Sequence, residues 1–183
     1  MTVFPLHTLA DAPAASRPAL QSLQDAFGFV PAVAGAIAGS PTLADAFVAV
    51  FRNAHAGTLD EAQIQALLLT NAVTNACEWA VAFHSALALR SGVSAADVAA
   101  LRRGFDPSDP RLAAPARFTR RLVERRGHAG EAHVQALLEG GCTAAQALEV
   151  VLVAAASTIT NYVATLAQPP LDDALRPHAW RPD

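Results

Sequence analysis

The chain contains no lysine, and its thirteen basic residues are all arginine. This absence excludes Schiff-base chemistry, which needs a lysine amine. The formal net charge of −3 argues against a nucleic-acid partner, because proteins that bind nucleic acid usually carry an excess of positive charge. The heavy use of arginine and alanine is typical of coding in a GC-rich genome, and we expect a bacterial protein.

Cysteines and long apolar runs are also scarce. The two cysteines are Cys77 and Cys142. The first residues have neither the basic start nor the apolar run of a signal peptide, so we expect a cytoplasmic protein whose cysteines are thiols. The longest apolar runs are short and interrupted, so the sequence predicts no membrane partner.

Alternating strand patterns are absent, and the sequence predicts an all-α fold. Serine caps, early prolines and terminal glycines bound helices within 16–28 and 40–57. Apolar residues at helical spacing follow from Leu59 to Asn75. Asn75 is a poor residue for a helix interior and a good cap, so we expect a break there and a new helix over 76–90.

The helices are expected to form one domain over residues 1–183. Within it, 1–58 form an N-terminal lead-in, 59–104 the core that carries the site, and 105–183 a C-terminal half. Residues 143–167 resemble residues 60–84 when the Ala-Gln pair at 145–146 is placed over the pair at 62–63. An internal helical duplication and a chance similarity of two Ala/Leu-rich helices both explain this.

The stretch "TNACEWAVAFH", residues 74–84, gathers the side chains most capable of chemistry. If Asn75 caps the helix, Cys77 lies in the first turn, where free amides and the helix dipole favour a thiolate. Glu78 then completes a capping box with Asn75, and its charge opposes ionisation of Cys77. The two effects on the thiol compete.

His84 follows Cys77 by seven residues, close to two helical turns, so both side chains project from nearly the same face. Two turns separate the Cα atoms by roughly 10 Å, which is long for a direct hydrogen bond. Ala80 lies between them, and its methyl side chain has no group that could hydrogen-bond to either residue. A buried histidine bonded to a carbonyl and an inert buried thiol are the structural alternatives.

The segment "CEWAVAFHSALALRSGVSAADVAALRRG", preceded by an apolar helix that ends in Asn75, resembles the core of the carboxymuconolactone decarboxylase and AhpD-like alkylhydroperoxidase superfamily. The lead-in "FGFVPAVAGAIAGSPTLADAFVAVF" and the closing "NYVATLAQPPLD" are similar to its peroxidase-related branch. The resemblance implies an all-helical, AhpD-like bundle that assembles as a homo-oligomer, commonly a dimer, trimer or hexamer. In the peroxidase members, a CxxC pair reduces peroxide and a lipoyl partner restores the thiols.

Carried over by this resemblance, Cys77 is the first cysteine, Trp79 the aromatic residue and His84 the histidine. Two parts of the family site are missing. Ala80 stands in place of the second cysteine, and Gln65 in place of the relay glutamate. An intact CxxC cycle therefore cannot operate.

The leading hypothesis is peroxide or thiol redox chemistry at Cys77, with a small hydroperoxide as substrate. Cys142, an outside thiol or a lipoyl group then resolves the oxidised sulfur. The first alternative is a decarboxylase-like acid-base enzyme that uses His84 with Glu78. The second is a non-catalytic protein that only assembles or binds a small apolar ligand.

The expected pocket is lined by the aromatic and small residues near the histidine, namely Trp79, Ala80, Phe83 and Tyr162. The histidines and carboxylates have no recognised zinc or iron spacing, so the sequence predicts no metal. No phosphate-binding glycine loop or dinucleotide fingerprint occurs, and no cofactor is predicted.

Overall fold

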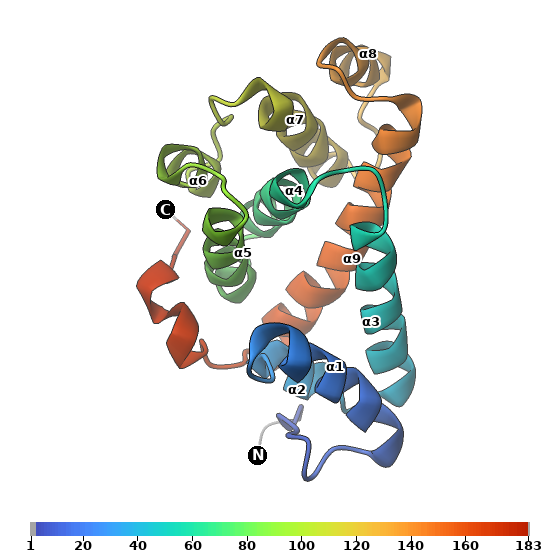
Figure 1. Ribbon diagram of the computed structural model, residues 1–183, viewed down its shortest axis with the longest axis vertical. Helices are drawn as coiled ribbons and strands as arrows, with labels where there is room; N and C mark the ends of the chain where they lie inside the picture. Colours follow the sequence, from blue (N-terminus) through green and yellow to red (C-terminus); the bar gives the residue numbers. More distant parts are fainter. Residues whose placement is uncertain (1–2, 183) are drawn as a thin grey trace.

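The computed structural model describes residues 3–182, and its regular structure there is helical, without strands (Figure 1). The prediction of an all-α fold is confirmed. The α-helices are α1 (Arg17–Phe27), α2 (Ala32–Ile37), α3 (Pro41–His55), α4 (Glu61–Thr74), α5 (Glu78–Arg90), α6 (Ala95–Arg102), α7 (Pro110–Glu124), α8 (Glu131–Glu139) and α9 (Ala144–Ala167). Two short 3₁₀ helices, η1 (Ala14–Ser16) and η2 (Asp173–His178), lie near the ends.

Helices α4 and α5 form the centre of the molecule. All side chains of residues 64–72 in α4 and 79–85 in α5 are buried. The two helices pack against each other, and α7 and α9 cover α4 (Figure 1). A helix that is buried on every side is apolar on every side, which explains why the sequence shows no polar face there.

Side-chain caps fix where several of these helices begin. The Ser40 hydroxyl accepts a hydrogen bond from the Leu43 amide, so the predicted start of α3 is confirmed. Capping boxes begin both α4, at Asp60, and α9, at Thr143. Such a cap stabilises a helix by about 1 kcal/mol. The two boxes coincide in the register that aligns 60–84 with 143–167; the duplication itself stays a prediction.

The C-terminal segment after α9 returns across α5 (Figure 1). The Asp172 carboxylate accepts hydrogen bonds from the Trp79 indole at 2.9 Å and from the Ala32 amide at 3.1 Å. The Arg102 guanidinium donates to the His178 carbonyl at 2.8 Å. The segment thereby joins α2, α5 and α6, and it holds the Trp79 ring in place.

Helix α9 is the most apolar of the long helices. By length and composition alone, it is the one helix within residues 3–182 that could cross a membrane, with a hydropathy of 1.7. This is weak evidence, because α9 also packs against α3 and α4 as a core helix does. Its outer face exposes Leu148, Val151, Tyr162 and Leu166. This stripe is the face we expect to meet a second copy, and the homo-oligomer stays a prediction.

Candidate functional site

The chain breaks between α4 and α5 where the sequence predicts it, but the cap is a different residue. Asn75 ends α4, and its side-chain amide donates to the Asn71 carbonyl at 2.8 Å. Ala76 takes a left-handed conformation with φ of 51°, and Cys77 is the N-cap of α5. The predicted capping box of Asn75 and Glu78 is therefore wrong, because Asn75 uses its side chain to close the preceding helix.

Cys77 is only 4% exposed. Burial raises the pKa of its thiol, since a thiolate there would lose its hydration. Hydrogen bonds from the Ala80 and Trp79 amides partly oppose this rise, and the charge of Glu78 adds to it. The effect of burial on the pKa of Cys77 is thus larger than that of the helix start, and the thiol form dominates at neutral pH.

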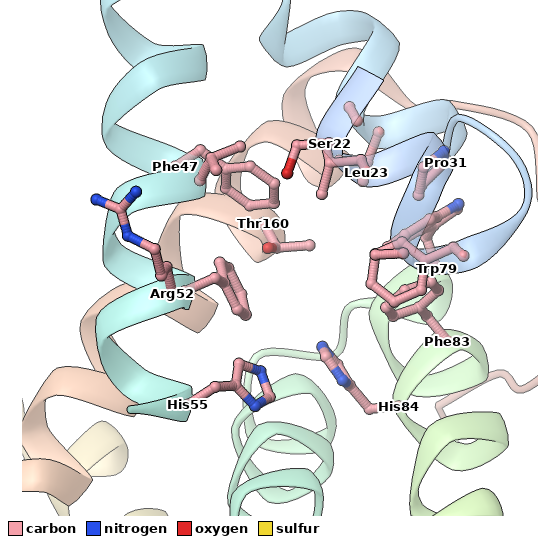
Figure 2. Close-up of a pocket in the computed structure, with 16 residues that line it drawn as sticks. Ser22, Leu23, Pro31, Phe47, Arg52, His55, Trp79, Phe83, His84 and Thr160 are labelled. Carbon is pink, nitrogen blue, oxygen red and sulfur yellow. The ribbon is translucent and has the colours of Figure 1, made fainter. Parts of the chain in front are cut away.

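The main apolar cavity lies between α1, α3, α5 and α9 and has a volume of about 330 Å³ (Figure 2). Its aromatic wall is formed by Phe27, Phe47, Phe51, Trp79 and Phe83. The Trp79 and Phe83 rings stack with centroids 4.9 Å apart, and the edge of Phe27 meets Phe83 at 5.1 Å. The volume lies at the small end of the range for ligand pockets, which indicates a small molecule.

Two histidines at one end of this cavity belong to a hydrogen-bonded row of four polar side chains, whose other members, Gln65 and Glu61, line a neighbouring cavity. His84, from α5, and His55, from α3, turn their rings toward one another across the cavity (Figure 2). The Nδ1 atom of His84 lies 3.0 Å from Oε1 of Gln65. Gln65 donates through Nε2 to Oε1 of Glu61 at 2.7 Å, and His55 Nδ1 lies 2.9 Å from Oε2 of Glu61.

These contacts fix which atoms donate and which accept between Glu61, Gln65 and His84. An ionised carboxylate only accepts, so the NH₂ group of Gln65 must face Glu61 and its carbonyl oxygen must face His84. His84 therefore carries its proton on Nδ1 and donates it to Gln65. The Nε2 atom of His84 is left with a free lone pair as an acceptor.

Burial also fixes the charge of His84. The pKa of the imidazole is lowered to about 3, chiefly by burial; the charge of His55 also lowers it, and that of Glu61 partly opposes the shift. Burial raises the pKa of Glu61, but hydrogen bonds from His55 and Gln65 outweigh this and leave it below its usual value. At neutral pH the site therefore pairs a neutral His84 with an ionised Glu61.

Cys77 is not among the residues that line the cavity of His84. It lines a second cavity of about 360 Å³ together with Glu78 and Thr165, and Trp79 borders both spaces. The sequence places Cys77 and His84 on nearly one face of a helix. The structure turns them toward different cavities because Cys77 is the cap and not a residue of the helical turn.

The other residues singled out in the sequence are scattered. Ala80 is fully buried, and Tyr162, expected in the pocket, is 60% exposed on the outer face of α9. Cys142 packs with Leu137 in a different core cluster from Cys77, and both cysteines are free thiols. Nothing in the structure joins Cys142 to Cys77 as a resolving pair.

Sequence reasoning missed several residues of the site. Glu61 lies four residues before Gln65 on α4, a spacing that lets the two side chains interact and that was the available signal for Glu61. His55 and Thr160 come from α3 and α9 and carry no local signal. Their place beside His84 depends on tertiary packing alone.

A comparison with protein-family models matches residues 28–109 to the carboxymuconolactone decarboxylase family. This region runs from α2 to α6 and contains the break between α4 and α5 as well as His84 and Gln65. A comparison with curated proteins gave no match.

Solved structures with the same fold cover nearly the whole chain. An uncharacterized peroxidase-related protein from Ralstonia eutropha JMP134, described as an alkylhydroperoxidase AhpD core, has a TM-score of 0.84 and 23% identity, over 94% of this chain and 93% of that chain. A cysteine-to-alanine variant of the debrominase Bmp8, in complex with 2,3,4-tribromopyrrole, has a TM-score of 0.81 and 20% identity, over 97% and 95%. A peroxidase-related protein from Silicibacter sp. TM1040 has a TM-score of 0.77 and 17% identity, over 94% and 92%. At these identities the likeness establishes the fold.

Proposed function

We propose that the chain, whose residues 28–109 match the carboxymuconolactone decarboxylase family, uses its aromatic cavity as a substrate site and His84 as the acid-base group within it. The substrate is a small, largely apolar molecule. The observation that carries the proposal is the state of His84, which is buried and neutral, with Nδ1 held by Gln65 and Nε2 free. This supports the acid-base alternative over the redox hypothesis.

A neutral imidazole can accept a hydrogen bond or a proton from the substrate. The low pKa makes His84 a weak base in the empty cavity, so it suits a substrate with an acidic proton, such as that of an enol, a phenol or an electron-poor ring N–H. As negative charge develops on such a substrate, it stabilises the imidazolium beside it. The carboxylate of Glu61, behind Gln65, favours the same charged form.

Binding to the cavity is measurable without knowledge of the natural substrate. The ligand of the debrominase, 2,3,4-tribromopyrrole, is a suitable probe because its ring is small, its N–H is a donor and its bromines quench tryptophan fluorescence. In a Trp180→Phe background, Trp79 is the only tryptophan; it borders the cavities of both His84 and Cys77, so its fluorescence reports a ligand in either one. We expect saturable quenching in this background.

The effects of substituting His84 and Cys77 on probe affinity then show which of the two cavities binds the probe. His84→Phe keeps a ring but removes the acceptor, and we expect it to weaken binding about tenfold, the equivalent of one hydrogen bond. Cys77→Ser is the matched control and should bind the probe as the parent does. Weakening by Cys77→Ser with no effect of His84→Phe would contradict the proposal.

Thiol chemistry at Cys77 is the second candidate. It is supported by the place of Cys77 at the start of α5, where the Ala80 and Trp79 amides act to lower the pKa of the thiol, and by the 360 Å³ cavity beside it. In this candidate a hydroperoxide oxidises Cys77 to a sulfenic acid and is itself reduced to the alcohol. An external thiol or lipoyl reductant then restores the thiol.

The raised pKa of Cys77 predicts that this reaction is slow at neutral pH, because the thiolate is the nucleophile. With one equivalent of cumene hydroperoxide at pH 7, we expect Cys77 to oxidise no faster than a free cysteine, as followed by intact-mass spectrometry beside Cys77→Ser. The rate should rise steeply above pH 9. Rapid oxidation confined to Cys77 at pH 7 would favour the redox candidate instead.

A further inference from the structure

The cavity of His84 contains one buried polar group that has no partner in the protein. Thr160, on α9, is 3% exposed, and its hydroxyl makes no hydrogen bond. Figure 2 shows this side chain on the cavity wall, between the α3 side chains Phe47 and Arg52 and the α5 side chains Trp79 and Phe83. A buried hydroxyl without a partner is costly, so its presence calls for an explanation.

Other threonines of the same helix show what Thr160 does not do. The Thr158 hydroxyl donates to the Ala154 carbonyl, and the Thr165 hydroxyl donates to the Asn161 carbonyl, both at 2.8 Å. This bond to the residue four positions earlier is the usual way for a helical threonine to satisfy its hydroxyl. Thr160 leaves that bond unmade, and its side chain stands on the cavity wall with its hydroxyl oxygen buried and without a partner.

We infer that Thr160 is a substrate-binding residue and that the cavity takes an uncharged ring compound bearing a hydroxyl group. This inference rests on the proposed use of the cavity as a substrate site. A ligand hydroxyl both donates and accepts, so its chemistry suits the Thr160 hydroxyl, and it also suits the acceptor Nε2 of His84 in the same cavity. The ring itself fits the aromatic wall.

The surroundings favour an un-ionised ligand. Apart from His84, Thr160 and the exposed side chains of Ser22, Arg52 and His55, the wall is built from aromatic and aliphatic side chains, where an ion would lose its hydration. Arg52, the arginine of the cavity, is exposed at its edge. A ligand recognised through a carboxylate would have to keep that group near Arg52. Thr160 would then remain without a partner.

Three probes of similar size test the inference: phenol, toluene and benzoate. Their affinities are measured by the fluorescence of Trp79 in the Trp180→Phe background. We expect Thr160→Val, which replaces the hydroxyl by a methyl group, to weaken phenol about tenfold and to leave toluene unchanged or tighter. Thr158→Val is the matched control, because its hydroxyl is already bonded within the helix, and it should alter none of the affinities.

Thermal unfolding of the unliganded variants separates binding from a structural role. Because the Thr160 hydroxyl has no partner, Thr160→Val should keep or raise the melting temperature, whereas a structural role predicts a fall. Equal effects of Thr160→Val on phenol and toluene would overturn the inference while leaving the cavity as a binding site. Benzoate binding tighter than phenol and lost in Arg52→Gln would also overturn it. Failure of every probe to bind would contradict the proposed function itself.

Discussion

Between pH 7 and pH 5, we expect the free energy of unfolding to fall by about 2 kcal/mol because of His84 alone. The folded-state pKa of about 3 lies below the value of about 6.5 for an unfolded histidine. In this window the unfolded chain binds a proton that the folded chain does not, so acid favours unfolding. The contribution is fully present above pH 6.5 and is lost progressively as the pH falls toward 3.

Denaturant unfolding at a series of pH values measures this slope. His84→Gln removes the titrating group, so the difference between the parent and this variant should change by about 2 kcal/mol over the same interval. His128→Gln makes the same change at an exposed position, and it should retain the parental slope. Parallel curves for the parent and His84→Gln would mean that His84 is not held neutral by burial.

Gln65→Glu should raise the pKa of His84 by about 2 units. The substitution is nearly isosteric and places a carboxylate 3.0 Å from Nδ1 of His84, where the amide oxygen now lies. Glu61 is already 2.7 Å from the side chain of residue 65, so the two carboxylates would share a proton at neutral pH. The total negative charge then equals that of the parent, but part of it lies on residue 65, in direct contact with Nδ1 of His84, where it favours the imidazolium more than the distant Glu61 does.

The measurement is an NMR titration of the histidine rings in the parent and the variant. Gln63→Glu is the matched control: it makes the same substitution on the same helix, at the third residue of its capping box, where glutamate is also accepted. It should leave His84 unchanged within a few tenths of a unit. A His84 that stays neutral down to pH 4 in Gln65→Glu would show that residue 65 does not set its charge.

Helix positions follow closely from the sequence because caps and breaks are local. Ser40 acts as a cap where predicted, and the break near Asn75 occurs. The error of two residues at the start of α5 is also local, because Asn75 can cap a following helix or bond back to the preceding one. The structure selects the second, and Cys77 becomes the cap.

The site was only partly predictable. His84 and Gln65 were identified through the family resemblance, and the structure brings them into contact. The pKa of the Cys77 thiol is set either by burial or by the start of the helix, and the balance depends on how exposed the side chain is. No local sequence pattern encodes that exposure. His55 and Thr160 reach the cavity from helices distant in the chain, so their roles emerge only once α3 and α9 are packed.

The central claim is that His84 is a neutral base whose free nitrogen is Nε2. A long-range ¹H–¹⁵N correlation spectrum of the unliganded protein, with His84 assigned by its loss in His84→Gln, measures this state directly. We predict the tautomer protonated at Nδ1 across pH 5 to 8, with Nε2 at the chemical shift of an unprotonated nitrogen. A ring protonated at Nε2, or one that titrates near pH 6.5, would contradict the account.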